Sequence, residues 1–257
     1  MARHSKWHNI KHKKALKDAK KSKIFTIHAK LIAIAAHRWW WDIEKNKALQ
    51  EAIYNAKAEN VPNANIERAI KRWTWELKDG TIEEILYEWY WAWWVAVIVK
   101  TLTDNRNRTA PNIRHIFSKY SWNLWESGSV NWIFSLKWVI YMNIEDKAKL
   151  EDLIFETDVD DYFCEEDFIK IITKSDNLYV VKDFFLKKGL SVEEITNEYI
   201  PNTYVNINNF DKLLKFTKMR EEFEDDDDVE SFFSNIEVDD NLQKEVDKYI
   251  EARRFKT

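Results

Sequence analysis

The densest run of side chains able to bind a ligand lies at the N-terminus of the chain. The first 30 residues hold 10 basic side chains and one acid, Asp18. Lysine ammonium groups on flexible stems suit phosphate oxygens, and a nearby aromatic ring can stack on an unpaired base. We therefore expect this strip to contact nucleic acid through Lys6, Trp7, Lys11, Lys13, Lys14, Lys17, Lys20, Lys21 and Lys23. The alternative is a solubilising tail without a partner.

Further basic residues extend this prediction beyond the strip. Arg68, Lys71 and Arg72 lie on an expected helix that adjoins it. In the segment TDNRNRT, Arg106 and Arg108 precede Thr109, which we expect to cap a helix that carries Arg114. A helix N-terminus with adjacent arginines can bind an anion. The alternative is that Asp104 pairs with these arginines in a purely structural role.

Other candidate sites are weaker. His4, His8 and His12 would share one face of a helix, but lysines surround them and no cysteine or carboxylate cluster supports them, so we predict no metal. The run Asp225–Asp228 lacks the alternating ligands and central glycine of a calcium loop, so we expect a solvated acidic turn. Cys164 lies in an expected strand with acids after it, which favours a packing role.

No segment predicts an enzyme. A phosphate-binding loop, a nucleophile elbow and a paired-carboxylate cleft are all missing from the sequence. We therefore predict a non-enzymatic protein without a cofactor or a small-molecule substrate. The alternatives are an enzyme that acts on nucleic acid and a structural scaffold without salt-dependent affinity for nucleic acid.

Composition limits the class of protein further. The 257 residues are 45% hydrophobic and 33% charged, and the longest apolar run, 89–99, is too short to span a bilayer. A single cysteine and the lack of an apolar signal segment indicate a reducing compartment, with the cytoplasm as the expectation and no membrane contact. The formal net charge of −4 conceals a balance of +10 over residues 1–79 and −14 over residues 131–257. Such asymmetry favours a polyanion contact at the basic end.

Periodicity predicts an α+β multidomain fold. Residues 1–79 should form a basic arm and a helical bundle, with Asp42 capping the second of three helices. Residues 80–131 and 203–238 should form a middle α+β domain, and residues 239–257 a charged helical tail. Residues 132–202 follow a β-α-β-β-α-β order, which predicts an inserted ferredoxin-like domain. We expect its first strand at 138–142, after a separate strand at 130–134, and Gly189 at the end of its second helix.

The balance of tryptophan and glycine is abnormal. The chain has 14 Trp and only 3 Gly, whereas an average chain is about 7% Gly because turns and helix ends need it. Tryptophan cannot replace glycine in that backbone role. Either the fold carries an unusual aromatic load, such as a membrane-interface belt, or the written sequence differs from the protein that the cell makes.

Several short motifs resemble the YebC family of probable transcriptional regulatory proteins, also called YebC/PmpR. The motifs are HSKW at 4–7, NIKH at 9–12, KIFT at 23–26, NIERAIKR at 65–72, VAVIV at 95–99, TDNRNRT at 103–109, and NL followed by ESGSV at 123–130. Mitochondrial members of the family include the translational activator of cytochrome oxidase subunit I. The resemblance covers about residues 1–238 and implies the same three-domain plan.

The resemblance also offers a cause for the missing glycines. The family has Gly at the positions of Trp39, Trp40, Trp41, Trp73, Trp75, Trp89, Trp91, Trp93, Trp94, Trp122, Trp125 and Trp138. Some bacteria read the codon UGA as Gly and others read it as Trp. We therefore predict that a gene with UGA for Gly was translated with a table that gives Trp.

The resemblance implies two functions. One is a DNA-binding transcriptional regulator. The alternative is a ribosome-associated translation factor that binds rRNA and eases synthesis of proline-rich sequences. Flexible lysines suit either polymer, and the sequence leaves the oligomeric state open. Departures from the family, including Arg3, Ile27 and Ala92, weaken residue-level transfer in the N-terminal region.

Overall fold

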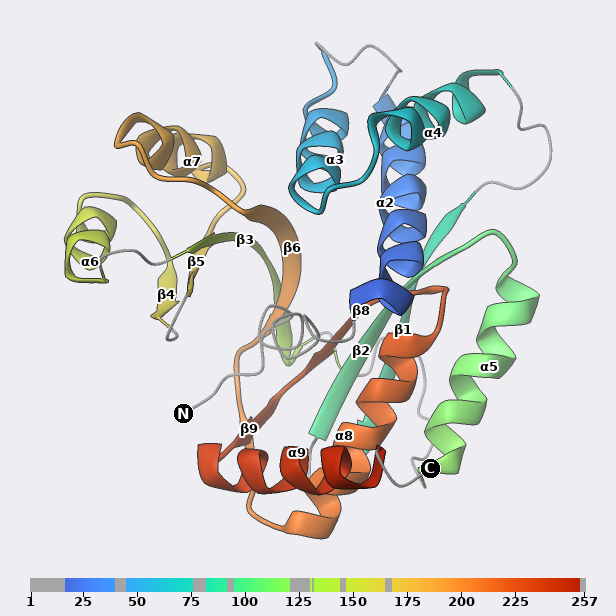
Figure 1. Ribbon diagram of the computed structural model, residues 1–257. Coiled ribbons are helices and arrows are strands. Elements are labelled where there is room, and N and C mark those ends of the chain that lie inside the picture. Colours follow the sequence, from blue (N-terminus) through green and yellow to red (C-terminus); the bar gives the residue numbers. More distant parts are fainter. Residues whose placement is uncertain are drawn as a thin grey trace.

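The structure is a computed structural model that describes residues 17–39, 45–75, 82–91, 95–120, 130, 132–143, 147–164 and 168–254. It is a mixed α+β fold with helices at the N-terminus, followed by antiparallel sheets that carry their own helices (Figure 1). No helix within these ranges is long and apolar enough to cross a membrane. The predicted fold class is confirmed.

Three helices form the N-terminal unit. They are α2 (Lys17–Trp39), α3 (Lys47–Ala58) and α4 (Asn63–Trp75). Their shared core contains Ile32, Leu49, Ala56 and Ile66, all 5% exposed or less. These apolar residues recur at helical spacing along each segment, so one face of every helix can be buried against the others.

The starts of these helices correct one expectation. α2 begins at Lys17, so the last lysines of the basic strip lie on it. The cap of α3 is Asn46 rather than Asp42, which lies outside the described residues. The Asn46 side chain accepts a hydrogen bond from the Leu49 amide (3.0 Å) and donates one to the Ala35 carbonyl (2.9 Å), which ties α3 to α2.

A three-stranded antiparallel sheet forms the centre of the molecule. Its order is β1 (Glu83–Trp91), β2 (Val95–Thr103) and β8 (Val229–Ser234), so the chain returns to this sheet after more than a hundred residues. The run VAVIV is buried on both faces, because Val95, Val97 and Val99 pack into the main core whereas Ala96 and Ile98 pack into a second cluster. Two helices, α5 (Arg106–Lys119) and α8 (Phe210–Asp225), share the main hydrophobic core with this sheet.

Trp89 fills part of that core. Its indole is 3% exposed and stacks on Phe117 of α5, with ring centroids 3.9 Å apart and planes 13° from parallel. The indole N–H has no hydrogen-bond acceptor among the described residues. The backbone needs no glycine here, since among the described non-glycine residues only Asn60 has a positive φ, at 58°. A glycine at 89 would instead let α5 approach the strand.

A second sheet carries the ferredoxin-like pattern. Its order is β4 (Asp161–Cys164), β5 (Phe168–Thr173), β3 (Phe134–Asn143) and β6 (Glu194–Pro201), with every neighbouring pair antiparallel. Two helices, α6 (Lys147–Phe155) and α7 (Leu178–Lys187), pack on it. Gly189 follows α7 with φ of 80°, which confirms its predicted place at the helix end.

The first strand of this sheet was predicted wrongly. Separate strands at 130–134 and 138–142 were expected, but one strand, β3, runs from Phe134 to Asn143. Val130 lies in a bend before it, where its carbonyl accepts a hydrogen bond from the Ile133 amide (2.8 Å). Ser135 and Lys137 interrupt the apolar residues of this strand, so the sequence pattern predicted two strands instead of one.

Two short strands and a last helix complete the fold. β7 (Val205–Ile207) pairs in parallel with β9 (Ile236–Val238), apart from the other two sheets. The helix α9 (Asp240–Arg254) packs with Val246 (0% exposed) and Ile250 (8%) in the main core. The predicted charged tail is helical, and one of its faces is part of the core.

The N-terminal helices contact the ferredoxin-like sheet through α3. The Asn55 amide donates to the Ile195 carbonyl (2.6 Å), and its oxygen accepts from the Ile195 amide (3.2 Å), on the edge strand β6. The Tyr54 hydroxyl donates to the Val192 carbonyl just before that strand. Asn55 therefore satisfies both backbone groups of one residue on the sheet edge.

Candidate nucleic-acid interface

The predicted basic strip meets the folded molecule on α2. Lys6, Trp7, Lys11, Lys13 and Lys14 lie outside the described residues, as do His4, His8 and His12. Lys17 and Lys20 lie on the first turns of α2, and Lys21 is exposed there. The strip therefore leads directly into a helix that packs on the rest of the fold.

Lys23 has a different role from its exposed neighbour Lys21. Its ammonium group donates to the Glu224 carbonyl (2.6 Å) and to the Asp226 carbonyl, at the C-terminal end of α8. Free carbonyls at a helix C-terminus carry partial negative charge, so a lysine is favourable there. Lys23 thus joins α2 to α8, and sequence reasoning did not predict this contact.

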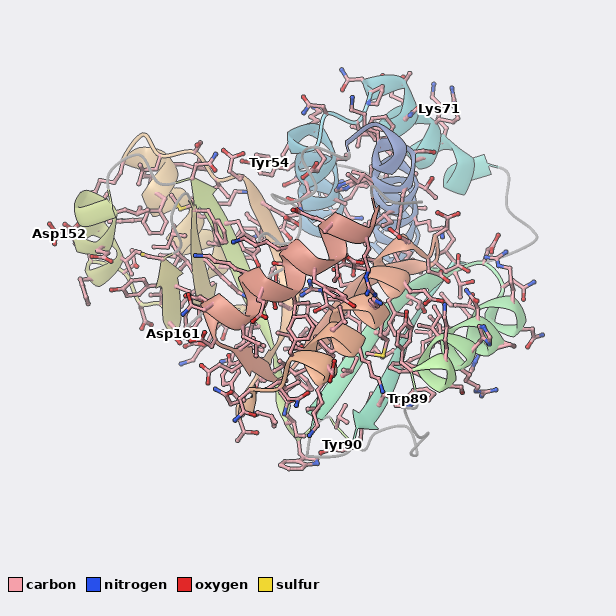
Figure 2. The ribbon with its side chains drawn as sticks, turned by 60° about the horizontal axis from the view of Figure 1, so that its bottom comes forward. Tyr54, Lys71, Trp89, Tyr90, Asp152 and Asp161 are labelled. Carbon is pink, nitrogen blue, oxygen red and sulfur yellow. The ribbon has the colours of Figure 1, made fainter. Side chains whose placement is uncertain are left out.

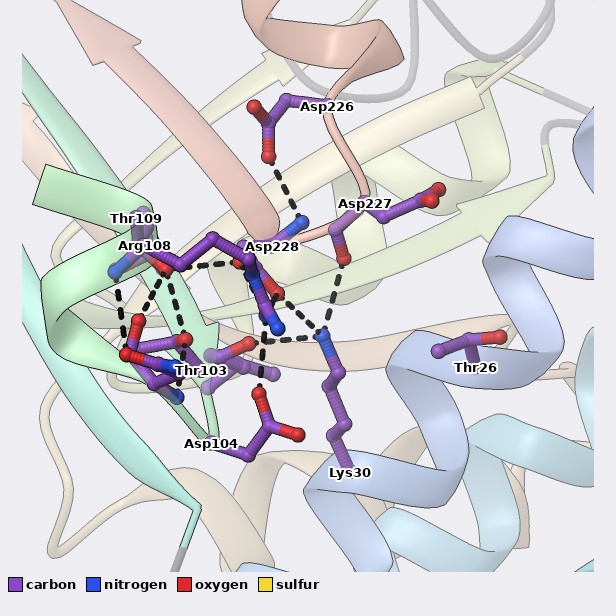
Figure 3. Close-up of polar contacts among 12 residues, drawn as sticks. Thr26, Lys30, Thr103, Asp104, Arg108, Thr109, Asp226, Asp227 and Asp228 are labelled. Carbon is purple, nitrogen blue, oxygen red and sulfur yellow. Dashed lines mark hydrogen bonds and ion pairs between the residues drawn. The ribbon is translucent and has the colours of Figure 1, made fainter. Parts of the chain in front are cut away.

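Lys30 lies two turns further along the same face of α2. It donates to the Leu102 carbonyl (2.9 Å), the Asp227 carbonyl (3.1 Å) and the Asp228 carboxylate (3.0 Å). Figure 3 shows this ammonium group reaching from α2 into the turn that follows α8. Lys23 and Lys30 together hold α2 against one acidic turn.

The segment TDNRNRT forms the start of α5. The helix begins at Arg106, and its cap is Asn105, whose side chain accepts from the Arg108 amide (3.1 Å). The prediction that Thr109 caps the helix was therefore wrong. Thr109 lies in the first turn with 2% of its surface exposed, where it bonds the Thr103 hydroxyl (2.7 Å) and Asp228 (2.8 Å). A buried threonine linked to two side chains is not available as a cap.

Asp228 is the centre of this site. Its two carboxylate oxygens accept hydrogen bonds from the Arg108 guanidinium (3.0 and 2.8 Å), from Thr109 and from Lys30 (Figure 3). Burial alone would raise its pKa, but the bonds from Arg108, Thr109 and Lys30 outweigh burial and hold the pKa below the ordinary value. The same hydrogen bond from Arg108 to Asp228 raises the pKa of the arginine. This carboxylate is therefore charged and is held by two cations.

The expectation for the acidic run was partly wrong. Asp225 and Asp227 are exposed, as a solvated turn requires, but only 8% of Asp228 is exposed. The alternative role for the arginines also has support, since Arg108 bonds Asp104 at 3.0 Å as well as Asp228. Even so, 56% of the Arg108 side chain is exposed.

Two other predicted arginines lie beside this cluster. Arg106 and Arg114 are exposed on α5. Burial raises the pKa of the Tyr87 hydroxyl on β1, and the positive charges of Arg106 and Arg114 oppose that rise. Arg108, which lies between them in the sequence, is joined to Lys30 of α2 through Asp228.

The remaining predicted residues lie on α4. Arg68 and Lys71 are exposed there, while the side chain of Arg72 lies outside the described part of the chain. Figure 1 shows α4 beside the end of α2 that is farther from the central sheet, so these two residues are separate from the α5 cluster. In Figure 2, Lys71 lies on the opposite side of the molecule from the exposed acids Asp152 and Asp161 of the ferredoxin-like unit.

The described ranges offer little support for a metal site or a reactive cysteine. They contain no group of three or more His, Cys, Asp or Glu side chains that could hold a metal ion. Cys164 is partly buried, with its sulfur 3.6 Å from a Glu151 carboxylate oxygen, a neighbour that disfavours a thiolate. The arrangement suits binding of an anion by fixed cations.

This combination defines a class: mixed α+β proteins in which a basic segment and a helical unit precede a central antiparallel sheet and a ferredoxin-like unit. Two family models identify the class more closely. The TACO1/YebC protein N-terminal domain matches residues 5–76, and the TACO1/YebC second and third domain matches residues 82–236. The chain belongs to the TACO1/YebC family.

Individual relatives agree with this assignment. A protein of Persephonella marina named probable transcriptional regulatory protein is 42% identical over 96% of this chain and its own full length. One of Thermotoga maritima with the same name is 43% identical over 96% of this chain and 98% of its own. The crystal structure of a conserved hypothetical protein from Aquifex aeolicus superimposes with a TM-score of 0.82 at 34% identity, over 87% of this chain and 93% of its own.

These alignments correct one expectation. The resemblance was expected to end near residue 238, with the last helix beyond the usual family end. An alignment over 96% of the chain is too long to leave out the whole of residues 240–257. Relatives therefore share at least part of the segment that forms α9.

Proposed function

We propose that this protein is a non-enzymatic regulator of gene expression that binds DNA through the phosphate backbone. The contact surface would comprise the basic strip with Lys21 of α2, Arg106 and Arg114 of α5, and Arg68, Lys71 and Arg72 of α4. The names of the relatives support a regulatory role in transcription.

One observation carries the proposal. Arg108 of α5 and Lys30 of α2, the helix into which the lysine strip leads, bind the same carboxylate, Asp228, although about 80 residues separate the two in the sequence. Lysine and arginine bound to phosphates release counterions, and this release supplies most of the affinity that does not depend on base sequence. The acidic ferredoxin-like unit, on the other side of the molecule, would repel the same polymer and limit the ways in which it can bind.

Titration of a duplex DNA at several salt concentrations tests the proposal. We expect the logarithm of the binding constant to fall linearly with the logarithm of salt, and the variant Arg106→Gln/Arg114→Gln to make that slope shallower by about 0.9 for each lost phosphate contact. The control is Lys174→Gln/Lys187→Gln, which removes the same charge from exposed positions of the ferredoxin-like unit. The control should leave the slope unchanged.

A second experiment separates DNA from ribosomal RNA as the target. Sedimentation of cell lysate with ribosomal subunits, without enrichment on promoter DNA, would assign the surface to translation instead. If the protein bound neither DNA, RNA nor ribosomes even in dilute buffer, the proposal would be wrong.

A further inference from the structure

The turn after α8 places four consecutive acids against the basic surface. α8 ends at Asp225, and the Asp226 side chain accepts from the Asp228 amide (2.9 Å), which closes the turn. Asn112 of α5 donates to the other Asp226 oxygen. The turn is thus fixed between α2 and α5, at the point where the two parts of the proposed phosphate-binding surface meet.

This turn already binds lysine and arginine side chains that could otherwise bind phosphate. Lys23 and Arg108 were both predicted to contact nucleic acid, yet Lys23 donates to two carbonyls of the turn region and Arg108 to both oxygens of Asp228. Lys30, on the same face of α2 as Lys23, donates to Asp227 and Asp228. One guanidinium nitrogen, Nη2, donates to both oxygens of Asp228, so the carboxylate occupies a charged donor that could otherwise bind a phosphate oxygen.

Arg108 remains accessible from solvent despite these bonds. Its side chain is 56% exposed, and it approaches Asp228 from the surface, whereas only 10% of the Asp228 side chain is exposed. A phosphate that arrived from solvent could therefore reach the guanidinium, but it would meet the exposed acids Asp225 and Asp227 at the same place. Phosphate binding here would have to replace existing contacts with Asp228.

We propose that the turn Asp225–Asp228 acts as an internal mimic of phosphate that competes with nucleic acid for Arg108 and Lys30 and so limits affinity. This inference rests on the proposed function, because it describes how the same surface is regulated. In the state described, the exposed arginines bind nucleic acid first, and Arg108 and Lys30 join only when the turn releases them. Lys23 stays with the carbonyls at the end of α8, which no carboxylate substitution removes.

The test compares Asp228→Asn with Glu198→Gln in duplex DNA titrations at several salt concentrations. Both changes remove one buried carboxylate charge, but Glu198 lies in the ferredoxin-like unit, where it binds Tyr141 (2.6 Å) and Lys170 (2.6 Å). We expect Asp228→Asn to tighten binding and to steepen the salt slope by about 0.9 for each released cation. Glu198→Gln should change neither.

Adding Arg108→Gln to Asp228→Asn tests whether Arg108 is a cation that Asp228→Asn releases to bind DNA. The double variant should lose about 0.9 of the slope gained by Asp228→Asn. If Asp228→Asn shows the same affinity and slope as Glu198→Gln while the unaltered protein binds DNA, the competition does not exist. If the unaltered protein does not bind at all, the proposed function itself fails, which is a different outcome.

A second variant keeps the test decisive if Asp228→Asn does not fold. Asp227→Asn retains the hydrogen bond from Lys30, because that bond goes to the backbone carbonyl. We expect tighter binding without a change in slope, relative to Asp176→Asn, an exposed acid of the ferredoxin-like unit. Equal affinities of these two variants would overturn the proposal.

Discussion

The N-terminal helices contact their neighbours in two chemically different ways. α2 meets the acidic turn through ammonium groups, with Lys30 bound to a carboxylate that also binds Arg108. α3 meets the ferredoxin-like unit through a neutral amide that pairs with the Ile195 backbone, and through lysines over aromatic rings. In that second contact, Lys47 lies 4.2 Å from the Tyr179 ring centroid and Lys182 lies 5.0 Å from that of Tyr54.

This chemical difference determines which of the two contacts can respond to a polyanion. Charges in a partly exposed cluster are screened by salt and can exchange partners with phosphate. An amide paired with an edge strand has no such competitor, so it fixes orientation instead. We therefore expect a polyanion to weaken the α2 contact and to leave the Asn55–Ile195 pairing of the α3 contact unchanged.

The largest expected effect is that of Asp228→Ala. The change leaves Lys30, Arg108 and Thr109 without their common acceptor, and removal of one member of a buried ion pair costs about 3 kcal/mol, at the lower end of the usual range because Arg108 is half exposed. Unfolding in urea measures the loss. Asp227→Ala, an exposed acid next to it, is the control and should cost less than about 0.5 kcal/mol. Equal losses would contradict the central role of Asp228.

A smaller effect is expected for Asn55→Ala. The change leaves the amide and the carbonyl of Ile195 without the partner that they have on α3. We expect it to lower the free energy of unfolding by about 1–3 kcal/mol, because these backbone groups stay buried. Hydrogen exchange should become faster at the Ile195 amide and stay unchanged at the Leu102 amide, which bonds the Asp228 carbonyl (2.8 Å). Lys57→Ala, on the exposed side of the same helix, is the matched control. Faster exchange at both amides would show that the two contacts are not independent.

The two contacts should also respond oppositely to pH. Because the pKa of Asp228 is lowered from 3.8, its contribution to stability is present above that value and is lost as the pH falls through the lowered pKa. Glu51 of α3 is 8% exposed, and burial raises its pKa from 4.5, a rise opposed by Tyr179 and by Lys182. Its contribution is therefore complete below 4.5 and is lost as the pH rises through the raised pKa.

Glu51→Gln tests this second case. The glutamine keeps a polar group beside Tyr179 without a charge to bury, so we expect greater stability at neutral pH and no difference in acid. Thermal unfolding of both proteins at neutral pH and in acid measures the two expected outcomes. A glutamine variant that was less stable at neutral pH would show that the charge of Glu51 is needed.

The smallest expected change in these contacts is that caused by restoring glycine at the twelve tryptophan positions. Of these twelve side chains the structure describes only those of Trp89 and Trp138, and neither is among the groups that form the α2 or the α3 contact described above, so both contacts should persist in hydrogen exchange. At position 89, α5 would move toward β1 to fill the volume that the indole occupies against Phe117. Peptide masses of the natural protein should show glycine at these positions. Codons other than UGA there, or a glycine form that fails to fold, would end this explanation.

Much of the fold could be predicted because its signals are local. The VAVIV run, the β-α-β-β-α-β order and Gly189 each depend on neighbours in the chain. The single strand β3 was missed because Ser135 and Lys137 interrupt its apolar residues. The packed face of α9 had a signal that was overlooked, since Leu242, Val246 and Ile250 recur every four residues among charges.

The candidate site could be predicted only in part. The basic residues of α5 and the strip stand out by composition, but their partner Asp228 lies 120 residues after Arg108 and 198 after Lys30. No local pattern marks an ion pair between such distant positions. Asn105 rather than Thr109 became the cap because Thr109 is committed to Thr103 and Asp228, another long-range contact.

The pairing of Asn55 with Ile195 also bears on aggregation. β6 is an edge of its sheet, and an unpaired edge is a template for strands of other molecules. A side-chain amide that occupies both backbone groups of one residue interrupts that template without forming a ladder. A fragment that contained the ferredoxin-like unit without α3 would expose this edge, and such fragments should self-associate more readily than the whole chain.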